Sequence, residues 1–178
     1  MERRKFLIGA GSAAVGASAL IGSGAFSFVR AERDMTVEVV DDEVAYLALE
    51  PTSAYADIEE DQLTLDFAGG YTLSGADQNG EGLNPNADSR FDDVFKITNQ
   101  GTNDARISFH DTEGAVGYDS PAATWYYSED SGWEGNEVNA DNPVIAPGES
   151  LYIHVIFWLT DYDESDLPDH LGIVAEEP

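Results

Sequence analysis

Oxygen-bearing side chains recur at alternate positions in the segment DQNGEGLNPNAD, which ends at Asp88. Asp77, Asn79 and Glu81 take positions 1, 3 and 5 of a twelve-residue loop, a glycine is sixth and Asp88 is twelfth. This spacing is near that of a calcium loop, in which alternate oxygens wrap one cation and the glycine makes the sharp turn. The short Asp at position 12 and the lack of flanking helical patterns favour a solvated acidic turn. Weak calcium binding is the alternative, and no other cofactor is expected.

Three histidines are the other side chains suited to metal binding or acid–base chemistry. His110, His154 and His170 lie far apart in the sequence, so two of them could meet only across strands, and we expect places on a sheet face or at the surface. The chain contains no G-x-S-x-G, P-loop, H-E-x-x-H or dinucleotide-binding motif. We therefore assign no catalytic residue and do not expect an enzyme.

Aromatic side chains gather between residues 125 and 133. Trp125, Tyr126, Tyr127 and Trp133 could line a sugar-binding patch. Aromatic residues in strands more often pack against cross-strand neighbours or in the core, and packing is our expectation. A glycan-binding role remains as an alternative.

The absence of cysteine removes several kinds of site at once. Disulfides, zinc–thiolate sites, iron–sulfur clusters and thiol catalysis all need cysteine. A blue-copper centre also needs a cysteine thiolate. The chemistry of this chain must therefore rest on oxygen, imidazole and aromatic groups.

Apolar and polar residues alternate along most of the chain from Met35 onward, which is the period of a β-strand. The segment QLTLDF places Leu63, Leu65 and Phe67 on one face. The strongest strand, SLYIHVIFWLT, places five apolar residues on one face: Leu151, Ile153, Val155, Phe157 and Leu159. No segment shows a convincing amphipathic helix.

These patterns predict an all-β protein, an antiparallel β-sandwich of the immunoglobulin-like or jelly-roll kind with seven to nine strands. The segments FKITN and ARISF, separated by QGTND, predict a β-hairpin over residues 95–109. Pro147 and Gly148 predict a type II turn before the longest strand. Residues 26–178 are expected to form a single domain, because about 150 residues suffice for one full core.

The first 25 residues have the order of an export signal. Arg3 and Arg4 begin a basic region, an apolar stretch follows, and small residues precede a cleavage site at Ala25. The arginine pair resembles the twin-arginine signal. We expect cleavage near Ala25 and a secreted or cell-surface protein. Retention as a membrane anchor is the first alternative, and a pilin-type filament core is the second.

The chain is strongly acidic, with 35 Asp and Glu against eight Lys and Arg and a formal net charge of −27. Removing residues 1–25 takes away three basic residues and one acidic residue, which leaves five and 34 and a net charge of −29. The acids are scattered among strand-forming residues, as on a folded surface adapted to high salt. Such a surface excludes nucleic acid, which needs Lys and Arg to neutralise phosphate, and disfavours anionic lipid. Contact with a membrane is expected only through an uncleaved signal segment.

The chain resembles a family of small exported haloarchaeal proteins. The resemblance rests on RRKFLIGAGSAAVGASALIGSGAF, VEVVDDEVAYLALEP, GLNPNADSRFDDVFKITNQGT and IAPGES. More distantly, a leader that ends in GSGAF and is followed at once by strands is similar to the TasA/camelysin group of extracellular fibre subunits. That resemblance implies that a segment after Ala25, FSFVRAERDMTVEVV, could complete the sheet of a neighbouring subunit. The metallopeptidase activity attached to the camelysin name finds no H-E-x-x-H here.

We therefore expect an exported, salt-adapted structural protein at the cell surface, with further copies of itself or other surface components as partners. Its assembly would proceed by strand addition into a fibre or matrix. An extracellular module that binds a cation or a glycan is the alternative. For an isolated monomer, residues 26–40 are expected to form a strand of their own domain.

Folding should depend on salt, because the carboxylates repel one another over roughly 10 Å at about 0.1 M salt and over roughly 3 Å at about 1 M. Dilution of the mature protein from molar salt to about 0.1 M should lower its melting temperature or unfold it. Circular dichroism melts across this range measure the effect. An unchanged spectrum and midpoint would contradict the high-salt interpretation of the charge.

Overall fold

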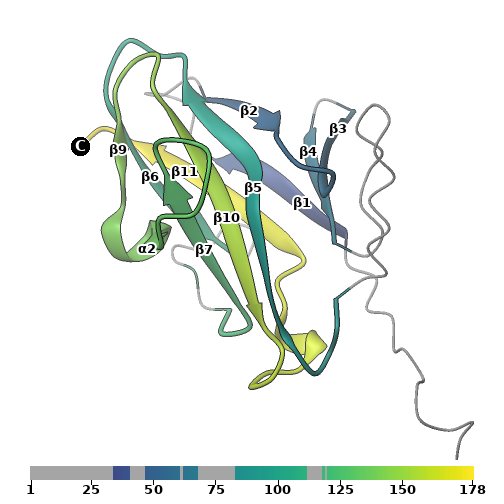
Figure 1. Ribbon diagram of the computed structural model, residues 1–178. Helices are drawn as coiled ribbons and strands as arrows, with labels where there is room; N and C mark the ends of the chain where they lie inside the picture. The colour runs from purple at the N-terminus through teal and green to yellow at the C-terminus, as the bar shows by residue number, and fades with distance from the viewer. Residues whose placement is uncertain (1–33, 41–46, 61, 68–82, 112–117, 119) are drawn as a thin grey trace, which may run out of the picture.

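The protein is a sandwich of two β-sheets, as a computed structural model shows (Figure 1). The structure describes residues 34–40, 47–60, 62–67, 83–111, 118 and 120–178. The predicted signal segment, with Arg3, Arg4 and the cleavage site Ala25, lies outside the described residues. No helix in the described part of the chain combines the length and apolar character needed to cross a membrane.

The first sheet has six strands in the order β3-β4-β1-β11-β6-β9. Its strands are β1 (Asp34–Val40), β3 (Ala56–Glu59), β4 (Gln62–Asp66), β6 (Ala105–His110), β9 (Val144–Ile145) and β11 (His170–Glu176). The second sheet has five strands in the order β2-β5-β10-β7-β8. Its strands are β2 (Leu47–Pro51), β5 (Asp88–Asn99), β7 (Ala123–Ser128), β8 (Asn136–Glu137) and β10 (Ser150–Trp158). A short helix α2 (Val138–Asp141) and a 3₁₀ turn η1 (Glu164–Asp166) lie in connections.

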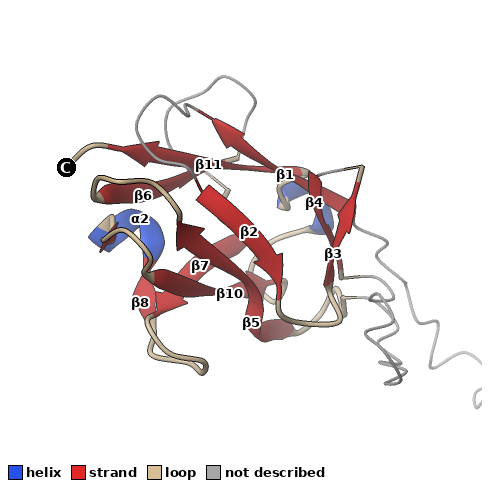
Figure 2. Ribbon diagram, turned by 90° about the horizontal axis from the view of Figure 1, so that it is seen from above, coloured by secondary structure: helices blue, strands red, loops and turns tan. Residues whose placement is uncertain are grey.

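The predicted all-β sandwich is confirmed, but its strand number was underestimated. The described residues contain eleven strands rather than seven to nine. Two of the additional strands, β8 and β9, have only two residues each and show no alternation that a sequence could reveal. Figure 2 shows the two layers from above, with the helices in connections outside the strands.

Strand β1 lies in the interior of the six-stranded sheet. It pairs with β4 antiparallel, Thr36 opposite Thr64, and with β11 parallel, Thr36 opposite His170. All other strand pairs in the described sheets are antiparallel. The expectation that residues 26–40 form a strand of their own domain therefore agrees with the arrangement over residues 34–40, while residues 26–33 lie outside the described residues.

The predicted hairpin over residues 95–109 is wrong. Its two strands lie in different sheets, because β5 belongs to the five-stranded sheet and β6 to the six-stranded sheet. The position beside β5 that a hairpin partner would occupy is taken by β10 on one side and β2 on the other. The connection after Asn99 is an arch from one layer of the sandwich to the other.

Asn99 explains why this connection crosses between sheets. Its side chain is fully buried, its Nδ2 donates to the carbonyls of Asn103 and Ile145, and its Oδ1 accepts the Gly101 N–H. Its backbone carbonyl accepts the Gly148 N–H. One amide thus ties the arch after β5 to the arch between β9 and β10. Its strong local hydrogen bonds compete with a simple hairpin turn.

The predicted turn at Pro147 and Gly148 is confirmed. Gly148 has φ +84°, which an L side chain adopts at a cost, and the Glu149 N–H donates to the Ala146 carbonyl at 3.0 Å. These features are those of a type II turn. The turn joins the two sheets rather than two neighbours in one sheet.

The alternating faces of the sequence form the core. All five predicted residues of β10 and its extension are buried, and so are Leu63, Leu65 and Phe67. Two groups of rings fill the layer between the sheets. Phe67 packs against Phe91 and Phe157, each at 4.9 Å between centroids, and Trp125 packs against Phe95 and Phe109.

A close contact between β6 and β11 sets the size limit at Gly172. The imidazole of His110, itself 2% exposed, lies so close that a Cβ on Gly172 would come within 1.8 Å of its Nε2. The two residues are paired in the ladder between the strands. Only glycine, which has no side chain, leaves room here for the buried imidazole of His110.

Gly172→Ala should destabilise the fold by about 1–3 kcal/mol, because the added methyl group overpacks the site. His110→Ala should also destabilise the fold. The double variant should lose less unfolding free energy than the two single variants together, since the methyl group then occupies space that the ring has left. Denaturant unfolding in molar salt measures all four proteins. Strictly additive losses would argue against the contact.

Candidate functional site

A buried polar network joins β5, β7 and β10 beneath the loop of residues 129–135, which we call the β7–β8 loop. His154 on β10 is fully buried although it points to the outer face of its sheet, since its neighbours Ile153 and Val155 face the core. Its Nε2 lies 2.8 Å from the hydroxyl of Ser128 on β7. Its Nδ1 accepts the Asp93 N–H at 2.8 Å.

The contacts of Ser128, His154 and Asp93 resemble a catalytic triad, but their hydrogen bonds run in the opposite direction. In a triad, Nε2 accepts the serine proton and Nδ1–H donates to the carboxylate. Here the Ser128 hydroxyl donates to the Asp130 carbonyl at 2.6 Å, so the imidazole Nε2–H donates to Ser128. The Asp93 carboxylate is 3.6 Å from Nδ1, which already accepts a backbone N–H. This arrangement does not activate Ser128 as a nucleophile.

The surroundings of His154 favour its neutral form. Burial lowers its pKa, and the carboxylates of Asp93 and Asp92 oppose this effect. Both ring nitrogens are satisfied only in the neutral tautomer with hydrogen on Nε2. In the protonated form, Nδ1 would carry a hydrogen and could no longer accept the Asp93 N–H.

Asp93 holds this network together from an unusual backbone conformation. Its φ of +50° is rare for a residue other than glycine, although Asp tolerates it better than most. The pairing of β10 with β5 shifts register between Ile153 and Val155, so Asp93 lies in a bulge opposite His154. Its carboxylate accepts hydrogen bonds from Ser131 Oγ at 2.7 Å and Gly132 N at 3.0 Å. The carbonyl of Asp93 accepts from Thr52 Oγ1.

The aromatic residues between positions 125 and 133 separate to the two sides of the sheet. Trp125 lies in the core, where its indole N–H donates to the Tyr118 hydroxyl, and burial raises the pKa of that tyrosine. Trp133 contacts Tyr126 at 4.6 Å on the outer side, and the Arg90 guanidinium lies 5.0 Å from the Trp133 ring centroid. These rings therefore pack against other groups of the protein, which agrees with the expected packing role. The four residues do not form one platform.

Two of the three histidines meet across strands, a possibility that the sequence left open. His110 at the end of β6 and His170 at the start of β11 have ring centroids 5.7 Å apart. The third histidine, His154, lies in the other sheet. Among the described residues, no group of three or more His, Asp or Glu side chains could hold a metal ion.

The structure describes only one residue of the predicted calcium loop. Asp77, Asn79 and Glu81 lie outside the described residues, whereas Asp88 begins β5. The Oδ1 of Asp88 accepts hydrogen bonds from the N–H and the hydroxyl of Thr160, at 3.1 and 2.7 Å. Asp88 therefore fixes the connection after β10, whether or not it also contacts a cation.

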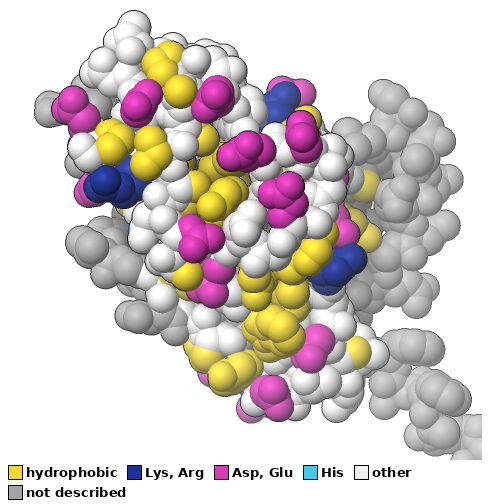
Figure 3. Space-filling model, turned by 60° about the vertical axis from the view of Figure 1, so that its left-hand side comes forward, with side chains coloured by type: hydrophobic (Ala, Val, Ile, Leu, Met, Phe, Trp, Pro, Cys, Tyr) yellow, Lys and Arg dark blue, Asp and Glu magenta, His cyan; other side chains and the backbone are white. Residues whose placement is uncertain are grey.

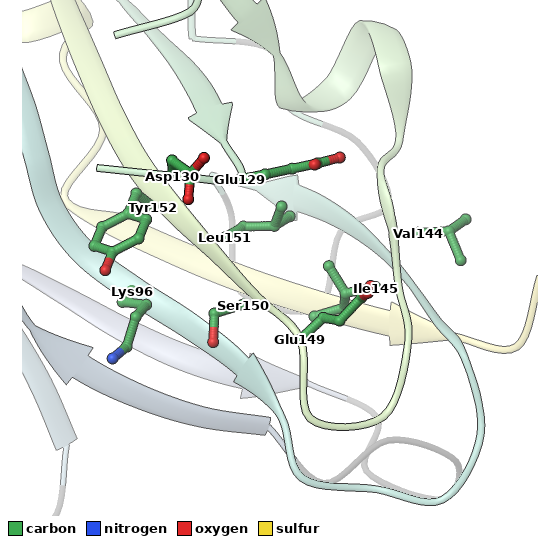
Figure 4. A pocket seen from close by; sticks show the side chains of 9 residues that line it. All are labelled: Lys96, Glu129, Asp130, Val144, Ile145, Glu149, Ser150, Leu151 and Tyr152. Carbon is green, nitrogen blue, oxygen red and sulfur yellow. The ribbon is translucent and has the colours of Figure 1, made fainter. Parts of the chain in front are cut away.

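A polar cleft of about 400 Å³ lies at the opposite end of the five-stranded sheet (Figure 4). Three carboxylates line it, from Glu129, Asp130 and Glu149, together with Lys96 and Tyr152. The Lys96 ammonium group is bound to Glu50 Oε2 at 2.7 Å, and this hydrogen bond raises its pKa. The cleft is thus acidic, like the face in Figure 3, where acidic side chains are scattered among hydrophobic ones.

Sequence reasoning missed Asp93, Ser128 and the β7–β8 loop as partners of His154. The signal that was available is His154 itself, a polar residue at an outward position between two half-buried hydrophobic residues of the strongest strand. Its partners come from strands that are distant in the sequence, 61 and 26 residues away. No local sequence pattern indicates these partners.

Calcium titration at fixed ionic strength tests the loop at residues 77–88. If the loop binds calcium, the melting temperature should rise and Asp77→Ala should abolish the rise. Asp88→Ala is harder to interpret, because the loss of its hydrogen bonds to Thr160 should lower the melting temperature even without calcium. Magnesium at the same ionic strength is the control. Equal changes in melting temperature with both ions would indicate that the loop is a solvated turn without a specific calcium site.

The comparisons with known proteins give one match. A family described as a protein of unknown function (DUF1102) matches residues 39–115. This span reaches from the end of β1 to just beyond β6, so it includes Asp93 and excludes His154 and Ser128. Neither the curated proteins nor the solved structures contain a match for the chain. The chain is therefore similar to this family over residues 39–115.

Proposed function

We propose that the protein is an exported, non-catalytic structural subunit of the cell surface that joins copies of itself by exchanging β1. The observation that carries the proposal is the place of β1 between β4 and β11. It is the first described strand, yet it fills an interior position of a sheet. A segment at the start of a domain can leave such a position and enter the same position in a neighbour.

The contacts of β1 supply specificity for such an exchange. Met35 and Val37 are 1% and 2% exposed, and each contributes about 1.5–3 kcal/mol on burial. Backbone pairing with β11 runs over five residues and with β4 over four. An exchanged β1 would make the same contacts with a neighbouring chain, so exchange costs little beyond the entropy of association.

The two described edges of the six-stranded sheet are poorly suited to the other route, addition of a strand at an edge. At β3, the Asp57 carboxylate accepts the Ile58 N–H at 2.8 Å and so occupies a donor that an added strand would need. The free side of β6 beyond β9 is covered, because Pro143 accepts the Ile107 N–H and the Asn139 side chain bonds both backbone groups of Phe109. Natural sheets block edges in this way against unwanted pairing.

The charge and the leader support the same proposal. Copies with a net charge of −29 repel one another in dilute salt, so assembly would require the screening that molar salt provides. The apolar stretch after Arg3 and Arg4 has the order of an export signal, and export would place the subunit outside the cell. The reversed polarity at Ser128 and His154 is consistent with a non-catalytic role.

The lack of native cysteine allows a direct crosslinking test. Thr36 on β1 lies opposite Thr64 on β4, and partners in an antiparallel ladder are close enough for a disulfide. Mature chains carrying Thr36→Cys and chains carrying Thr64→Cys should be mixed in molar salt and oxidised. If β1 exchanges, a covalent heterodimer should appear on a non-reducing gel, with filaments or oligomers in electron micrographs.

Each single variant oxidised alone gives the background of random collisions. The Thr36→Cys/Thr64→Cys double variant gives the position of an intrachain bond. A mixture that yields no more dimer than this background, together with dispersed monomers in micrographs, would overturn the proposal.

A further inference from the structure

The β7–β8 loop lies on the outer face of the five-stranded sheet, and one carboxylate accepts two of the hydrogen bonds that hold it there. Figure 2 shows the loop in tan beside β8. Ser131 Oγ and Gly132 N both donate to the carboxylate of Asp93, at 2.7 and 3.0 Å. Trp133 then reaches back to contact His154, at 5.7 Å between ring centroids. Gly132 and Gly135 have φ of +115° and +80°, backbone conformations that favour glycine.

The same carboxylate lies near a nitrogen that can gain a proton. Asp93 Oδ1 is 3.6 Å from His154 Nδ1, and the two form no hydrogen bond because both are acceptors while Nδ1 carries no proton. Protonation would turn Nδ1 into a donor that faces the Asp93 N–H, and the bond between them would be lost. The imidazolium would then need an anionic acceptor, and Asp93 is the carboxylate in reach.

We propose that His154 is an acid-sensitive latch for the β7–β8 loop. When Nδ1 takes up a proton, the Asp93 carboxylate turns from Ser131 and Gly132 to the imidazolium, and the loop detaches from the sheet. The loop loses both hydrogen bonds to Asp93, and the outer face around Trp133 and His154 opens to solvent. The sandwich beneath it stays folded.

The groups around His154 set how the latch responds to pH. On β5, the carboxylates of Asp92 and Asp93 favour the charged form and Arg90 opposes it, while Glu134 on the loop also favours it. Tyr126 on β7 is uncharged near neutral pH, and burial raises its pKa. The Asp92 carboxylate is bound to the Arg90 guanidinium at 3.1 Å, whereas the Asp93 carboxylate lies 3.6 Å from Nδ1.

The sign of the effect follows from burial. Burial lowers the folded-state pKa of His154 below its ordinary value of about 6.5, so the unfolded chain binds this proton more readily. The stabilising contribution of neutral His154 is therefore complete above about pH 6.5 and is lost as the pH falls through the lowered pKa. Loop release should accompany the uptake of that proton.

Amide hydrogen exchange of residues 129–135 in the mature protein, in molar salt, tests the latch. The matched variant is His154→Asn, whose Oδ1 can accept the Asp93 N–H and whose side chain does not titrate. The ratio of wild-type to variant exchange rates at each pH removes the intrinsic pH dependence of exchange. The ratio should be near one at about pH 8 and should rise about tenfold or more below the pKa of His154.

Ring signals of His154 in NMR spectra give its protonation in the same samples, and amides of Ile97 and Ile153 report the core. A ratio that stays near one while the ring titrates overturns the proposal. It is also overturned if the ring does not titrate above about pH 4, or if core amides become exposed together with the loop.

Asp93→Asn provides a second reference if His154→Asn fails to fold. Asn tolerates the positive φ of this position and still accepts the Gly132 N–H, but its neutral amide attracts an imidazolium weakly. The rise in loop exchange at low pH should then be much smaller than in the wild type. An equal rise in this variant would also overturn the latch.

Discussion

The apolar layer between the two sheets has to offset the repulsion among carboxylates that leave the chain with a net charge of −27. The rings of Phe67, Phe91 and Phe157 at one place, and of Phe95 and Trp125 at another, fill this layer. Repulsion acts over the whole surface, so a weakly packed core would not survive dilution of salt. The same constraint keeps fully buried polar residues few among the described ones, namely Asn99, His110, Ser128 and His154, since an unpaired polar group would add a cost that the core has to cover.

Alternation in the sequence was enough to predict the fold class and the core residues that β4 and β10 contribute. Leu63, Leu65 and the inward residues of β10 follow the period of two, and burial of one face leaves little freedom of register. Alternation does not tell which sheet a strand joins. The hairpin at residues 95–109 failed for that reason, because the buried amide of Asn99 bonds two arches that only the folded chain brings together.

The site was predicted less well than the fold. His154 was expected on a sheet face or at the surface, but its partners Asp93 and Ser128 were not predicted, because they approach only after three strands have paired. A bulge decides the geometry: the register shift opposite Ile153 and Val155 puts Asp93 at φ +50° and aims its N–H at the imidazole. Strain of this kind is held only where the surroundings fix it, and it has no signature in a single sequence.

The proposed assembly and the proposed latch depend on different parts of the molecule. Strand β1 and its neighbours β4 and β11 form the six-stranded sheet, whereas His154 and the β7–β8 loop belong to the outer side of the five-stranded sheet. Asp93 is the link between them, since its carbonyl accepts from Thr52 in the connection from β2 to β3. The latch moves the carboxylate of Asp93 and leaves that carbonyl in place. A released loop therefore changes the surface that a subunit presents without loosening the sheet in which β1 would be exchanged.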